Sequence, residues 1–137
     1  MKIPLVDKSS YLKGLFITAR LDKQLNEKEK EILKKISDKL GFAPDFFDET
    51  IRGLLSNKYI VDDPIVFTDN NVAKSFIKDA VKLAFADGEV SNSEIEWIKK
   101  TANINSLDDE FVTNEFKANQ SLHKLWPNVE LSLFSMI

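Results

Sequence analysis

The segment ADGEVSNSE at residues 86–94 separates two stretches of helical periodicity and holds three carboxylates within eight residues. A weaker copy, LDKQLNEKE at residues 21–29, lies sixty-five positions earlier in the chain. The two copies share an aspartate (Asp22 and Asp87) and a glutamate (Glu29 and Glu94) in register. An acidic inter-helix segment that occurs twice predicts a fold made of two related helical units.

The same offset extends well beyond the acidic segments. When residues 9–57 are aligned with residues 74–122, ten of the forty-nine pairs are identical, whereas chance would give about three. We therefore predict one domain, 1–137, made of two pseudo-repeated three-helix units, with a connector at 58–73 and a C-terminal tail at 126–137. A three-helix unit rarely covers its own apolar faces, so the units are expected to pack as a pseudo-twofold bundle.

Apolar spacing and helix-end signals predict an all-α bundle of six to seven helices. An irregular lead-in at 1–8 is expected to precede the first helix, which begins at Ser9 or Ser10 and ends near residue 21. Gly41 should stop the second helix and Pro44 should begin the third, which buries Phe46 and Phe47. The fourth helix is capped by Asp69 or Asn70 and is the most apolar, which predicts a central position. The fifth and sixth helices are expected over 91–102 and 108–125, followed by an extended tail.

Composition excludes several classes of protein. The net charge of −3 argues against a nucleic-acid binder, which needs clustered Lys and Arg. The absence of Cys excludes disulfides and thiolate metal sites. No signal peptide and no apolar run long enough for a membrane span is recognisable, so a cytoplasmic location is expected.

One stretch carries a resemblance to a known family. A helix that ends in AFADGEV at residues 84–90, followed by Glu94 and an apolar helix, resembles the tellurite-resistance TerB-like domains. The resemblance implies an all-helical fold and acidic residues proposed to bind metal, which here are Asp22, Glu29, Asp87 and Glu94. The first copy departs from the family pattern, because Lys23 and Gln24 stand where Gly88 and Glu89 stand in the second. A match to the family does not imply that this chain confers resistance to tellurite.

The acidic segment has two other possible interpretations. A calcium-binding EF-hand loop fails, because it would place Leu83 and Phe85 at positions that need oxygen ligands. Helix capping accounts for part of the pattern, since Ser91 and Glu94 have the spacing of a capping box and Gly88 suits a left-handed helix end. Glu29 and Glu94 are thus either caps or ligands.

The aspartates are harder to explain structurally, because each follows a helix C-terminus, where the helix dipole disfavours an anion. If the two turns meet, their carboxylates would repel one another unless a hard cation such as Ca²⁺ or Mg²⁺ bound there. The predicted metal ligands are Asp22, Glu29, Asp87, Glu89 and Glu94.

The resulting hypothesis is a non-enzymatic TerB-like domain that binds a divalent cation in a stress or tellurite-resistance context. The alternative is a protein-interaction module that uses the tail or a groove between the units. In that tail Phe134, Met136 and Ile137 either seal the bundle or contact a partner. An enzyme is not expected, because the chain shows no nucleophile arrangement, phosphate loop or cofactor motif.

Overall fold

The computed structural model describes residues 3–20, 27–56, 63–85, 90–119 and 132–135, and these residues form helices and no strands. The prediction of an all-α bundle is confirmed for this part of the chain. The helices are α1 (Leu5–Arg20), α2 (Glu27–Lys39), α3 (Pro44–Ser56), α4 (Asn70–Ala84), α5 (Asn92–Ile104), α6 (Asp109–Ala118) and the 3-10 helix η2 (Ser132–Ser135). None of them combines the length and apolarity that a membrane span requires.

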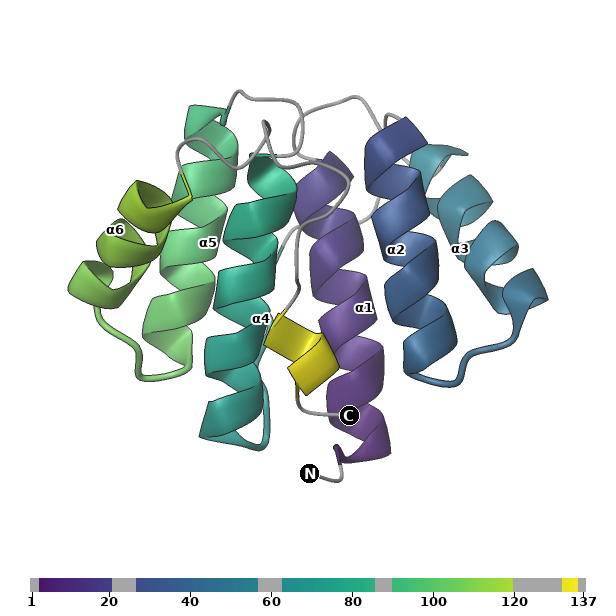
Figure 1. Ribbon diagram of the computed structural model, residues 1–137, viewed down its shortest axis with the longest axis horizontal. Coiled ribbons are helices and arrows are strands. Elements are labelled where there is room, and N and C mark those ends of the chain that lie inside the picture. Colours follow the sequence, from purple (N-terminus) through teal and green to yellow (C-terminus); the bar gives the residue numbers. More distant parts are fainter. Residues whose placement is uncertain (1–2, 21–26, 57–62, 86–89, 120–131, 136–137) are drawn as a thin grey trace.

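Two parallel helices form the centre of the bundle. α1 and α4 pack against each other and run in the same direction (Figure 1). α2 and α3 pack against α1, while α5 and α6 pack against α4. The first turns of α2 and α5 therefore lie at the same end of the bundle, where α1 and α4 end (Figure 1).

The core is concentrated on the two central helices. α4 buries ten of its residues, and this agrees with its predicted central position. Phe76 of α4 packs edge-to-face against Tyr11 of α1 at a ring separation of 5.4 Å and contacts the rings of Phe67 and Trp97. Aromatic pairs in this geometry add to the stabilisation from burial alone.

Local signals placed several helix ends correctly. Asp69 caps α4 by accepting a hydrogen bond from the backbone N–H of Asn71. Gly41 follows α2 in a left-handed conformation (φ 89°), and the N–H of Phe42 returns to the carbonyl of Ser37. This geometry is that of a glycine helix stop. Pro44 begins α3 as predicted, and its fixed φ suits a first turn.

Four predictions were wrong. α1 begins at Leu5 rather than at Ser9 or Ser10, because Pro4 restricts the residue before it and not those after it. α6 ends at Ala118, with Asn119 as its C-cap, and does not reach residue 125. The described part of the tail is the 3-10 helix η2 and is not extended, although it packs against α4. Phe46 is exposed and stacks on Phe42, so in this pair only Phe47 is buried.

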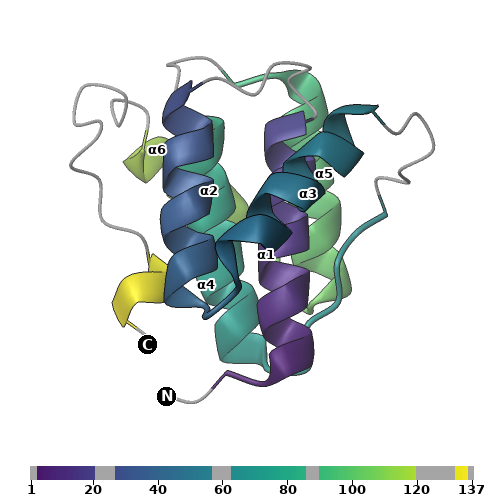
Figure 2. The ribbon, with the colours of Figure 1, turned by 90° about the vertical axis from the view of Figure 1, so that its right-hand side faces the viewer.

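Of the predicted connector at 58–73, residues 70–73 form the first turn of α4, and residues 63–69 cover one face of the central helices. Ile65 and Phe67 are buried, so the connector contributes apolar residues to the core as predicted. The side chain of Asn105 donates to the carbonyl of Ile65 (2.7 Å) and accepts from the N–H of Phe67 (2.9 Å). η2 lies on the opposite face of the bundle from the connector (Figure 2).

Candidate functional site

The structure describes two of the five predicted metal ligands. Glu29 lies in the first turn of α2 and Glu94 in the first turn of α5, and both side chains are buried. Asp22, Asp87 and Glu89 lie outside the described residues. Within those residues, no group of three or more His, Asp or Glu side chains is positioned to hold a metal ion.

Glu94 has a clear structural role. Its Oε1 accepts a hydrogen bond from the Ser91 backbone N–H at 2.9 Å, and Ser91 Oγ accepts one from the Glu94 backbone N–H at 3.1 Å. This reciprocal pair is the predicted capping box, and it satisfies two N–H groups that the helix leaves without partners. A carboxylate in a first turn is also stabilised by the helix dipole.

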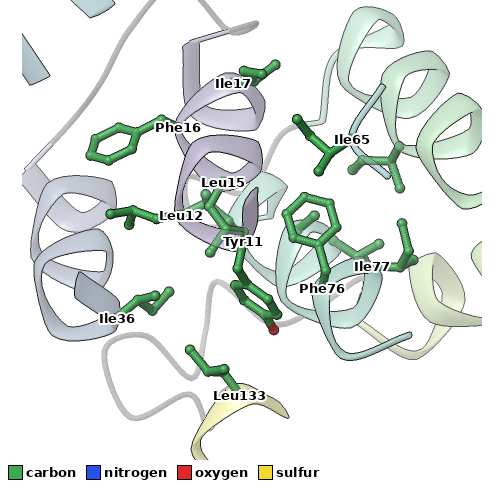
Figure 3. Close-up of a cluster of buried hydrophobic side chains, with 14 of the residues drawn as sticks. Tyr11, Leu12, Leu15, Phe16, Ile17, Ile36, Ile65, Phe76, Ile77 and Leu133 are labelled. Carbon is green, nitrogen blue, oxygen red and sulfur yellow. The ribbon is translucent and has the colours of Figure 1, made fainter. Parts of the chain in front are cut away.

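A buried polar cluster that the sequence did not reveal lies between α1 and α4. The Tyr11 hydroxyl donates to Asp79 Oδ2 (2.5 Å), and it lies 2.9 Å from Ser75 Oγ. Ser75 and Asp79 are one helical turn apart on α4, so they share a face. All three side chains are buried, and Figure 3 shows the Tyr11 ring between the apolar side chains of the two helices.

The tail completes this cluster. Asp79 Oδ1 accepts the backbone N–H of Ser132 at 2.6 Å, and Asp79 Oδ2 accepts the backbone N–H of Leu133 at 3.0 Å. Leu133 is fully buried and points from η2 toward Tyr11 (Figure 3). Asp79 therefore binds the first N–H groups of η2, as an N-cap carboxylate does within one helix.

Burial dominates the electrostatics of the cluster. It raises the pKa of the Asp79 carboxyl to about 6, although the hydrogen bonds from Tyr11, Leu133 and Ser132 and the charge of Lys82 act in the opposite direction. Burial, together with the charge of Asp79, raises the pKa of the Tyr11 hydroxyl well above its usual value. A buried carboxylate is strongly disfavoured unless donors surround it. Three of the donors to Asp79 come from other elements, namely α1 and η2.

Comparisons with protein-family models, curated proteins and solved structures gave no match.

One sequence signal could have identified Asp79, although Asp79 is not among the predicted site residues. Asp79 is an acidic residue within the most apolar helix, with Phe76, Ile77, Ala80 and Val81 around it. A charge at such a position must be paired, which makes it a residue to examine. Its partners, Tyr11 and the tail, are too distant in sequence for periodicity to identify.

Proposed function

We propose that the chain is a non-enzymatic helical domain of the TerB-like kind that binds a divalent cation, Ca²⁺ or Mg²⁺, at its two acidic inter-helix segments. The ligands would come from Asp22, Glu29, Asp87, Glu89 and Glu94. The stress or tellurite-resistance setting of this proposal derives from the resemblance alone.

One observation carries the cation proposal. The helix ends that flank residues 21–26 and 86–89 lie at one end of the bundle, with buried Glu29 and Glu94 in the adjoining first turns (Figure 1). Carboxylates that converge on one point repel one another unless a hard cation with oxygen ligands binds there, and we assign that cation to this end of the bundle.

Contacts between the central helices support the duplication behind this proposal. The sequence alignment pairs Tyr11 with Phe76 and Gly14 with Asp79. In the structure Tyr11 contacts Asp79, while the ring of Phe76 lies so close to Gly14 that a Cβ there would be 2.6 Å from it. These are equivalent contacts under an exchange of the two units, as expected for a pseudo-twofold axis between α1 and α4.

The test is a titration of the ¹⁵N-labelled full chain with CaCl₂ and with MgCl₂, followed by NMR. We expect saturable shifts of amides near residues 22 and 87. Glu94→Gln keeps an oxygen for the Ser91 N–H but removes the charge, so it should weaken metal binding while preserving the cap. Glu110→Gln, an exposed change on α6, is the matched control. Absence of shifts at millimolar metal would refute the cation site.

A second function is favoured by the contact between Asp79 and η2. We propose that the chain serves as a protein-interaction module in which the tail, or the surface that it covers, contributes to partner binding. A buried carboxylate that anchors two backbone N–H groups is a recognition device for a chain segment. Affinity capture with wild type and Leu133→Ala, followed by titration of the purified partner, tests it. Equal affinity for both forms would exclude a role for the tail.

A further inference from the structure

η2 covers a buried surface of α1 and α4, here called the groove, that binds it through hydrogen bonds and one apolar contact. Its floor is formed by Tyr11 of α1 and by Ser75 and Asp79 of α4, and both oxygens of Asp79 accept backbone N–H groups from η2. The side chain that η2 inserts is Leu133, which is fully buried. η2 is therefore held by two backbone N–H donors and by one apolar side chain, that of Leu133.

The groove is held in place by the helices and not by the segment in it. The Tyr11 hydroxyl donates to Asp79 Oδ2, and Ser75 lies one turn before Asp79 on the same helix. All three side chains belong to α1 and α4, so these contacts involve no atom of η2. η2 supplies two of the three donors that Asp79 receives from other elements, so another segment that replaces η2 must supply equivalent backbone N–H groups.

The equivalent position in the first unit differs from Asp79. The alignment pairs Asp79 with Gly14, which has no side chain, and the connector residue Ile65 packs over Gly14 on the opposite face. At that position of α1, Gly14 therefore supplies no counterpart to the acceptor that Asp79 presents to η2.

We infer that the groove formed by Tyr11, Ser75 and Asp79 is a peptide-binding site that η2 occupies in cis. Its ligand in trans is a peptide with two successive free backbone N–H groups at the start of a helical turn, the second N–H belonging to a leucine. This inference rests on the proposed interaction function and specifies its site and the chemistry of its ligand.

A proline substitution provides a selective test. Proline lacks the N–H group but fits the first position of a helical turn, so Ser132→Pro removes the donor to Asp79 Oδ1 while the rest of η2 can form. Ser132→Ala keeps the N–H and is the matched control. Because a tethered segment competes at a high effective concentration, wild type and Ser132→Ala should resist an added peptide.

The probe is a fluorescent synthetic peptide of residues 128–137, measured by anisotropy against each full-length protein. We expect it to bind the Ser132→Pro protein at least tenfold more tightly than wild type or Ser132→Ala. Peptides that carry Ser132→Pro or Leu133→Ala should bind at least tenfold more weakly than the unmodified peptide. Adding Asp79→Asn to the Ser132→Pro protein should cause a comparable loss. Amide shifts of Tyr11 and Ser75 should report the same event.

Three results would overturn the inference: no peptide binding to the Ser132→Pro protein, equal binding of the Leu133→Ala peptide, or an η2 that stays docked in the Ser132→Pro protein. Partner binding that depends on Leu133 but occurs without peptide binding in trans would refute this groove and leave the interaction function standing. If the peptide binds in trans but no partner binds in a tail-dependent way, the interaction function would be refuted and the peptide-binding groove would stand.

Discussion

Asp7 and Thr68, which are sixty-one positions apart, are joined by two hydrogen bonds. Asp7 Oδ1 accepts the Thr68 backbone N–H at 2.9 Å, and Asp7 Oδ2 accepts the Thr68 hydroxyl at 2.8 Å. Asp7 is fully buried in the first turn of α1. The pair therefore ties the connector to α1 just before α4 begins.

Asp7→Ala is expected to lower the free energy of unfolding by about 2–3 kcal/mol, because the Thr68 N–H loses its acceptor and α1 loses an acidic residue from its first turn. Urea denaturation of both proteins measures this difference. Asp38→Ala, an exposed change on α2, is the control and should stay within about 0.5 kcal/mol of wild type. If both variants lose equally little, Asp7 does not anchor the connector.

Asn105, the C-cap residue of α5, also holds the connector by hydrogen bonds. Its Nδ2 donates to the carbonyls of Ile65 and Thr101, and its Oδ1 accepts the Phe67 N–H. Asn105→Ala leaves these buried groups without their side-chain partner, and a loss of about 2–4 kcal/mol is expected. Hydrogen exchange should also show faster exchange of the Phe67 amide. Asn103→Ala, an exposed neighbour on α5, should change neither measurement; an unchanged Phe67 exchange rate in Asn105→Ala would count against this role.

Several helix ends and the central position of α4 could be predicted, because their signals lie within one segment of the sequence. Asp69, Ser91 and Gly41 each act on backbone groups close in sequence. The hydrogen bonds of Asp7 and Asp79 could not be predicted, because their partners lie more than fifty positions away. Sequence periodicity indicates that such an aspartate is buried, and a buried charge needs a partner. It does not identify which distant residue that partner is.

The candidate cation site was predictable only in part. The capping role of Glu94 follows from the spacing of Ser91 and Glu94, and the structure shows it. Whether Glu94 also binds a cation depends on Asp22, Asp87 and Glu89, which lie outside the described residues. The alignment that identified these carboxylates also paired Gly14 with Asp79, but pairing by sequence gave no hint that the two central helices meet there.

Gly14 is required by the close approach of α4. A Cβ at this position would lie 2.6 Å from Phe76 Cε1 and Cζ. Gly14→Ala gains about 1 kcal/mol of helix propensity, but overpacking of the core costs about 1–3 kcal/mol. A net loss of up to about 2 kcal/mol is expected by urea denaturation. In a Phe76→Leu background the same change should become neutral or stabilising; an equal loss in both backgrounds would show that the ring is not the cause.

Asp79 should make stability depend on pH in an unusual direction. Its pKa is about 6 in the folded protein against an ordinary value of 3.8, with burial as the largest cause. Between these values the folded chain binds a proton that the unfolded chain releases, so acidification from neutral pH to about pH 4 stabilises the fold through this group. That stabilisation reaches up to about 3 kcal/mol and disappears as the pH rises through about 6.

Asp79→Asn removes the titration while keeping the shape of the side chain. The pH dependence that Asp79 contributes should therefore be missing from the variant, and wild type should gain stability relative to it as the pH falls. Urea unfolding of both proteins at several values between about pH 4 and pH 7 gives the two curves. Parallel curves across this range would mean that Asp79 has the same proton affinity in the folded and unfolded chain. In that case, burial would not disfavour the charged form of the Asp79 carboxylate in the folded protein, contrary to what its position between α1, α4 and η2 implies.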